Sequence, residues 1–74
     1  MNVTVRLFAT FREGRGKELS LEMAEDATPA IVAERLGIGV KDIAILLVNG
    51  RDGKVDGSLA EGDRVSFFPP VGGG

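Results

Sequence analysis

The C-terminal carboxylate is the group in this 74-residue chain best placed to do chemistry. The chain ends in Val71-Gly72-Gly73-Gly74, directly after an apolar segment and two prolines. Proline has no N–H for a sheet and fixes its own φ, so we expect residues 69–74 to leave the fold as a flexible tail. Extended at roughly 3.3–3.6 Å per residue, the tail would reach about 20 Å. Glycine lets backbone approach other groups closely, so the tail could enter a narrow channel and present the carboxylate of Gly74 to another protein.

Two simpler explanations of the glycine run stay open. Chain termini are commonly disordered and without function, and a short glycine run can be a remnant of cloning. Flexible linkers, however, are usually longer and richer in serine. The abrupt order of apolar strand, Pro69-Pro70, glycines and chain end therefore favours a working tail.

The side chains offer little chemistry of their own. The sequence contains no cysteine and no histidine, which removes the thiolate nucleophile, the disulfide, the commonest general base and the commonest metal ligand. Asp52 and Asp56 flank a glycine turn but lack the ligand density of a calcium loop, so we expect no metal and no bound cofactor. These features argue against a self-sufficient enzyme. They leave open a substrate protein whose reactive group is its own C-terminus.

Composition also narrows the partners and the location. The formal net charge is −2 and the sequence has neither tyrosine nor tryptophan, so we expect no nucleic-acid binding. The longest apolar run, residues 43–48, is far too short to cross a bilayer, and the N-terminal segment alternates and carries Arg6, unlike a signal peptide. We therefore expect a soluble cytoplasmic protein without a membrane partner.

The elements that must position the tail follow from periodicity. Residues 3–8 and 18–23 alternate apolar and polar side chains around a glycine-rich turn, which predicts a β-hairpin. Thr28 and Pro29 are suited to the N-cap and first position of a short helix, which Gly37 would end. The helix is expected to bury four residues on one side: Pro29, Val32, Ala33 and Leu36.

The second half of the chain predicts three more strands. Residues 43–48 form an apolar run before the turn signal Asn49-Gly50, which predicts a buried strand. A very short strand is expected around Val55, and a last strand over residues 64–68. The predicted fold is α+β, a mixed sheet packed against one main helix, with a folded domain over residues 1–68 and a tail over 69–74.

Two phenylalanines lie out of phase with the core positions of their strands. Phe8 has the parity of Thr4 and Arg6, and Phe68 has the parity of Arg64 and Ser66. If the two strands are neighbours, both rings form an apolar patch beside the tail, as at protein interfaces. Isolated exposed apolar residues are also common, and a bulge would reverse the parity. The parity leaves the position of Phe11 undecided.

The motifs of the chain resemble those of a known family. Residues 64–74 read Arg-Val-Ser-Phe-Phe-Pro-Pro-Val-Gly-Gly-Gly, and residues 7–13 read Leu-Phe-Ala-Thr-Phe-Arg-Glu. With the turns at 48–51 and 59–65, these segments resemble the MoaD/ThiS-type ubiquitin-like sulfur carriers, and among them most closely the MoaD type, the small subunit of molybdopterin synthase. The resemblance extends over essentially the whole chain and implies the ubiquitin-like β-grasp fold.

The resemblance also implies a reaction sequence. An adenylating enzyme of the ubiquitin-activating kind would use ATP and Mg²⁺ to convert the carboxylate of Gly74 into an acyl-adenylate. A sulfur donor such as a persulfide sulfurtransferase would then form a thiocarboxylate. The tail would enter the large subunit of molybdopterin synthase and deliver sulfur to the molybdopterin dithiolene, the chain itself being a non-catalytic sulfur-donating subunit. The partner-binding residues would be Phe8, Phe68, Pro70, Gly72 and Gly73.

Other end uses of the same tail remain possible at this point. One is sulfur donation to thiamine, tRNA thiolation or amino-acid synthesis. Another is a ubiquitin-like modifier joined through Gly74 to lysines of other proteins, because only the attacking nucleophile differs. A third is an interaction domain with an idle tail, which predicts that loss of Gly73 and Gly74 changes nothing.

Overall fold

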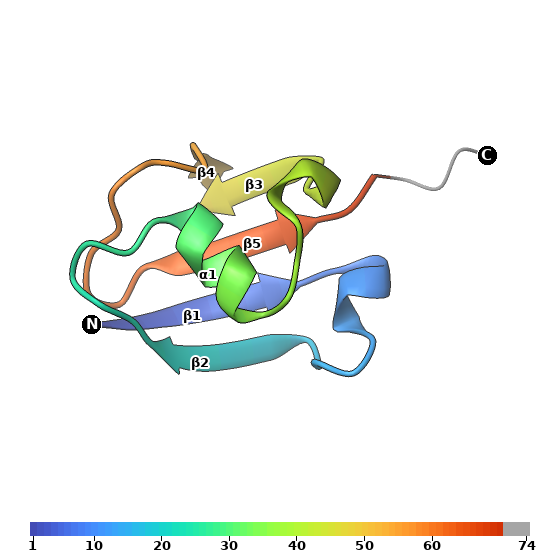
Figure 1. Ribbon diagram of the computed structural model, residues 1–74, viewed down its shortest axis with the longest axis horizontal. Helices are drawn as coiled ribbons and strands as arrows, with labels where there is room; N and C mark the ends of the chain where they lie inside the picture. The colour runs from blue at the N-terminus through green and yellow to red at the C-terminus, as the bar shows by residue number, and fades with distance from the viewer. Residues whose placement is uncertain (71–74) are drawn as a thin grey trace.

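The computed structural model describes residues 1–70 (Figure 1). A five-stranded mixed sheet carries one α-helix on one face, with two short 3₁₀ helices in the connections. In chain order the elements are β1 (Asn2–Leu7), η1 (Ala9–Arg12), β2 (Glu18–Glu22), α1 (Pro29–Arg35), η2 (Val40–Asp42), β3 (Ile45–Val48), β4 (Arg51–Asp52) and β5 (Arg64–Phe68). Among the described residues, no helix is both long and apolar enough to cross a membrane.

The sheet places the last strand in its centre. The strand order is β2-β1-β5-β3-β4, and β5 pairs parallel with β1 and antiparallel with β3. The register sets Val5 opposite Val65 and Leu7 opposite Phe67, so the two strands run in the same direction. The end of β5 therefore lies beside the end of β1 and the start of η1 (Figure 1).

The core lies between the sheet and α1. Val5, Leu7 and Phe67 are completely buried on the sheet side, and Val32 and Ala33 are completely buried on the helix side. This burial follows the alternation expected for the first and last strands. Burial of the apolar stripe holds α1, since isolated helices below ~12–15 residues are marginal in water.

The predicted ends of α1 are confirmed. The hydroxyl oxygen of Thr28 accepts a hydrogen bond from the backbone N–H of Ile31 at 3.3 Å, and Pro29 is the first helical residue. Gly37 follows the helix with φ +75°, in the left-handed region that favours glycine. Pro29 is buried as expected, whereas Leu36 at the C-cap is only half-buried.

Two strand predictions are wrong in detail. The short strand is β4, not a strand at Val55, because the tight turn at Asn49-Gly50 pairs Arg51 with Val48 at once. The carbonyl of Val55 instead accepts a hydrogen bond from the N–H of Ala30 at 2.8 Å. β3 is also not the buried strand that was expected, since α1 covers only one side of the sheet and Ile45 is 50% exposed.

Candidate functional site

The rings of Phe8 and Phe68 stack on one another at the tail end of the sheet. Their centroids are 4.0 Å apart and their planes differ by 10°. The contact follows from the parallel register, because the residues after Leu7 and Phe67 are neighbours on the face opposite the core. Both rings are half-buried, whereas Phe67 is completely buried. The predicted parity of the two phenylalanines is confirmed, while their role in binding a partner stays a prediction.

The stack extends into a larger apolar patch on the uncovered face of the sheet. Ile45 pairs with Phe68 and Leu47 pairs with Ser66, which places both side chains on the face of Phe68. We call Phe8, Ile45, Leu47 and Phe68 the open-face patch. Sequence reasoning missed Ile45 and Leu47, since a run of six apolar residues looks buried on both faces.

Arginines lie against the outer edge of this patch. The guanidinium carbons of Arg6 and Arg12 are 5.7 and 5.2 Å from the centre of the Phe8 ring, within the range of cation–π contacts. The Nε–H of Arg12 also donates to the carbonyl of Leu7 at 2.8 Å, which fixes this side chain over the ring. Positive charge therefore borders the patch on the β1 side.

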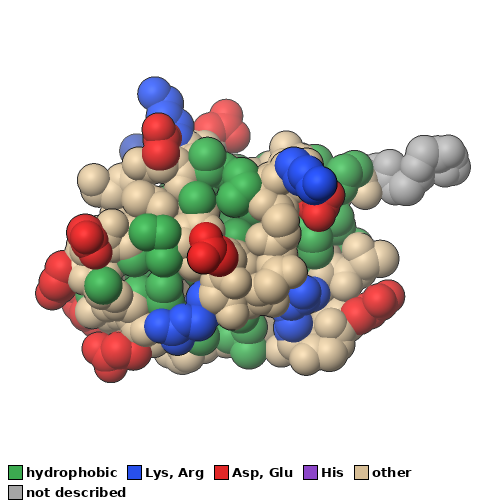
Figure 2. Space-filling view, in the orientation of Figure 1, with side chains coloured by type: hydrophobic (Ala, Val, Ile, Leu, Met, Phe, Trp, Pro, Cys, Tyr) green, Lys and Arg blue, Asp and Glu red, His purple; other side chains and the backbone are tan. Residues whose placement is uncertain are grey.

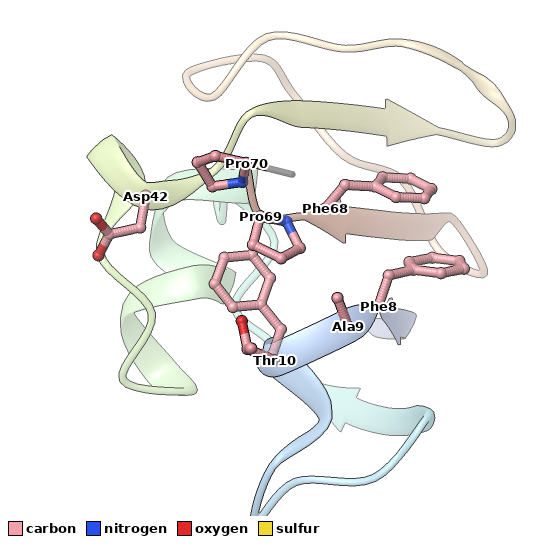
Figure 3. Close-up of a pocket in the computed structure, with 8 residues that line it drawn as sticks. Phe8, Ala9, Thr10, Asp42, Phe68, Pro69 and Pro70 are labelled. Atoms are coloured by element: carbon pink, nitrogen blue, oxygen red, sulfur yellow. The ribbon is translucent and has the colours of Figure 1, made fainter. Parts of the chain in front are cut away.

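A cleft of about 700 Å³ opens on the other side of the stack, where β5 ends (Figure 3). We call it the tail-base cleft. Its walls come from η1, from the last residue of η2 and from the end of β5: Phe8, Ala9, Thr10, Phe11, Asp42, Phe68, Pro69 and Pro70. Phe11, which the sequence left undecided, is 8% exposed and belongs to both the core and this cleft.

The wall formed by η1 begins with an unusual backbone. Ala9 has φ +52°, in the left-handed region that costs a non-glycine residue roughly 1–2 kcal/mol. This turn ends β1 and carries the chain into η1, which places Thr10 and Phe11 beside the prolines. Strained backbone of this kind is often found at functional sites. The sequence gives no signal for it, because such a turn usually carries glycine or asparagine.

The prolines stop the sheet as predicted. The backbone N–H of Ala44 donates to the carbonyl of Phe68 at 2.8 Å, and β5 ends at that residue. Pro69 is half-buried and Pro70 is exposed, and both line the tail-base cleft. The predicted reactive residue Gly74 and the predicted partner contacts Gly72 and Gly73 lie outside the described residues, as does most of the predicted tail. Among residues 1–70, no three acidic side chains converge in a way that would hold a metal.

Comparison with known proteins identifies the family. Residues 5–74 match the model of the ThiS family. The chain belongs to the ThiS family. As a family member, it is a ubiquitin-like protein of the MoaD/ThiS type, as its motifs suggested.

Individual relatives support both the fold and the family. Small archaeal modifier protein 3 of Haloferax volcanii is 39% identical over an alignment of 92 positions that covers all of both chains. A putative molybdopterin converting factor, subunit 1, from Pyrococcus furiosus is 30% identical, with a TM-score of 0.78 over 96% of this chain and 99% of that one. The predicted ubiquitin-like β-grasp fold, a five-stranded mixed sheet with one helix, is thereby confirmed.

A second solved structure shows such a fold with a partner. Subunit 1 of the molybdopterin-converting factor of Helicobacter pylori, solved in a complex with subunit 2, matches all of both chains with a TM-score of 0.64 and 23% identity. At this identity the match concerns the fold alone.

Proposed function

We propose that the chain is a ubiquitin-like modifier whose C-terminal carboxylate, on Gly74, is activated and joined to amino groups of other proteins. The observation that carries this proposal is the 39% identity, over both full chains, with small archaeal modifier protein 3. The match of residues 5–74 to the ThiS family includes the terminal glycines. The chain supplies the reactive group, and its partners supply the catalysts.

The proposed reaction has two steps. A carboxylate oxygen of Gly74 attacks the α-phosphorus of ATP on an Mg²⁺-dependent adenylating enzyme, and pyrophosphate leaves. The neutral amine of a lysine then attacks the carbonyl carbon of the acyl-adenylate, AMP leaves, and the amine loses a proton as the isopeptide bond forms. The residues of this chain bind and orient. Pro69 and Pro70 end the sheet, and the open-face patch gives the enzyme an apolar surface beside the end of β5.

Sulfur transfer is the second candidate. The 30% identity with a putative molybdopterin converting factor subunit favours it, together with the Phe-Phe-Pro-Pro-Val sequence before the glycines. Here a sulfur donor such as a persulfide sulfurtransferase attacks the same acyl-adenylate, and the resulting thiocarboxylate of Gly74 serves molybdopterin synthase or another sulfur acceptor. Both candidates share the activation step.

Mass spectrometry of the protein in its native cells tests the proposal. Trypsin cuts after Arg64, so a modified lysine would carry residues 65–74 as a branch with a defined mass. We expect such branched peptides in cells that express the wild-type chain. A chain lacking Gly74, which leaves residues 1–70 unchanged, is the control and should give none.

The same sample separates the two candidates. Free chain that has gained the mass difference between sulfur and oxygen, confined to the C-terminal peptide, would establish sulfur carriage. If wild-type cells contain neither branched lysines nor a thiocarboxylate, and purified chain supports no ATP–pyrophosphate exchange with the adenylating enzymes of those cells, the proposed function is wrong.

A further inference from the structure

The tail-base cleft has a composition that selects its occupant. Phenylalanine, proline and alanine side chains make up most of its wall, and the polar residues that line it are Thr10 and Asp42, whose carboxylate points outward from the other lining residues (Figure 3). Asp42 is exposed and takes part in no ion pair among the described residues. The cleft is therefore an apolar depression with one unpaired negative charge at its edge.

The charges on the two sides of the aromatic stack are opposite. Arg6 and Arg12 lie against Phe8, whereas Asp42 lies across the cleft, beyond Pro69 and Pro70 (Figure 3). A binding partner that covers both sides must therefore present acidic groups toward the arginines and a basic group toward Asp42. Such an arrangement fixes the orientation of a partner more than it adds affinity.

We propose that the tail-base cleft receives an apolar side chain of the adenylating enzyme, flanked by a lysine or arginine that pairs with Asp42. This inference rests on the proposed function and names a contact of the same activation step. The position of the cleft supports this occupant, because Pro69 and Pro70 form part of its wall and lead directly into the residues on which the enzyme acts. An enzyme that holds the chain at Pro69 and Pro70 therefore also meets the cleft.

The polar groups of the cleft argue against a nucleotide as the occupant. Phosphate-binding sites use arginine, lysine or a row of backbone N–H groups. The carboxylate of Asp42 would repel phosphates, and no basic side chain is among the described residues that line the cleft. An apolar side chain with an adjacent cation matches both the apolar wall and the negative charge of Asp42.

Steady-state kinetics of ATP–pyrophosphate exchange test the contact, with the chain as the varied substrate of the adenylating enzyme from the same cells. Asp42→Asn removes one exposed charge pair, and we expect KM to rise about two- to fivefold. Asp42→Lys places a lysine next to the basic residue of the enzyme, and because the two positive charges repel each other we expect KM to rise at least about tenfold. The kcat should stay within about twofold, since the reacting carboxylate is untouched.

A matched control reports the effect of charge alone. Asp26→Lys makes the same change in the exposed loop between β2 and α1, which lies at the end of the molecule opposite the end of β5, where acidic side chains gather (Figures 1 and 2). We expect its KM to stay within about twofold of the wild-type value. Raising the salt concentration should increase the wild-type KM more than that of Asp42→Asn, because screening acts on the pair that the variant lacks.

Cross-linking identifies the occupant directly. The chain contains no cysteine, so Thr10→Cys gives a unique thiol at the edge of the cleft that can carry a benzophenone. Irradiation with the enzyme should capture a peptide with an apolar residue beside a lysine or arginine, and Asp26→Cys should capture far less. Urea unfolding of each variant checks that the domain remains folded.

Each outcome decides something. Normal exchange by the wild-type chain, an unchanged KM for Asp42→Lys and no preference for cross-linking from Thr10→Cys would overturn the inference and leave the proposed function standing. Capture of a peptide without a basic residue would also overturn it. If the wild-type chain supports no exchange at all, the proposed function fails and this inference fails with it.

Discussion

Replacing Phe68 by alanine should weaken partner binding more than it weakens the fold. A completely buried phenylalanine loses about 3–5 kcal/mol on truncation to alanine. Phe68 is half-buried, and its main described contact is the stack with Phe8 at 4.0 Å, a kind of pair worth about 0.5–1.5 kcal/mol beyond its buried area. We therefore expect the free energy of unfolding to fall by about 1–2 kcal/mol, which lowers Tm by roughly 5–15 °C in a domain of this size.

The effect on binding should be larger. An aromatic residue near the centre of an interface costs about 2 kcal/mol or more when truncated, which is roughly a thirtyfold loss of affinity. A domain of this length has a stability of about 4–11 kcal/mol, at 0.05–0.15 kcal/mol per residue, so the variant stays largely folded at 25 °C. Urea denaturation gives the first quantity, and the KM for pyrophosphate exchange with the adenylating enzyme gives the second.

Two comparisons make this test specific. Phe67→Ala removes the completely buried neighbour and should lower the free energy of unfolding by the full amount of about 3–5 kcal/mol. This value is the reference for truncation at a core position. A double-mutant cycle between Phe8→Ala and Phe68→Ala should give a coupling of about 0.5–1.5 kcal/mol in the free energy of unfolding. If Phe68→Ala instead loses as much stability as Phe67→Ala and keeps the wild-type KM, Phe68 belongs to the core and the reasoning is refuted.

Three further substitutions test local features by urea denaturation. Thr28→Ala removes the acceptor for the N–H of Ile31 and should cost about 1 kcal/mol; an unchanged midpoint would mean that the cap contributes nothing. Ala9→Gly relieves a left-handed backbone at φ +52° and should add about 0.5–1 kcal/mol after the entropy of glycine is counted, whereas a lower midpoint would show that the methyl group packs. Asn49→Asp replaces the amide that donates to Asp63 at 2.9 Å with a carboxylate. The free energy of unfolding should fall by about 1–3 kcal/mol, and 1 M salt should restore part of it because it screens the two negative charges. A loss that salt leaves unchanged would contradict this electrostatic explanation.

The local parts of the fold were predictable from the sequence because their signals lie within a few residues. Alternation located β1, β2 and β5, and Thr28, Pro29 and Gly37 located the ends of α1. The parity of Phe8 and Phe68 also held, since a strand that runs straight to its last residue keeps its period of two.

The features that were missed depend on pairing between distant segments. Ile45 is exposed because β3 pairs with β5 on a sheet that is covered on one face, which an apolar run alone does not reveal. The strand expected at Val55 was wrong because the turn before Arg51 already brings residues 51 and 52 to pair with β3. The tail-base cleft brings together η1, Asp42 and the two prolines, and roughly thirty residues separate each of these segments from the next. The backbone of Ala9, which shapes the cleft, is left-handed, but the sequence has no glycine at this position to indicate it.

The parallel pairing of β1 and β5 explains why every feature of the candidate site lies at one end of the molecule. Because the last strand is central and runs in the same direction as the first, its end meets the end of β1 and the start of η1. The chain therefore leaves the fold between a stacked aromatic pair and an apolar cleft, with arginines on one side and Asp42 on the other. An antiparallel last strand would put its C-terminal residue at the opposite end of β1, far from Phe8. Strand direction thus places Pro69 and Pro70, which precede the glycines, beside the surface that we propose as the binding site of the partner.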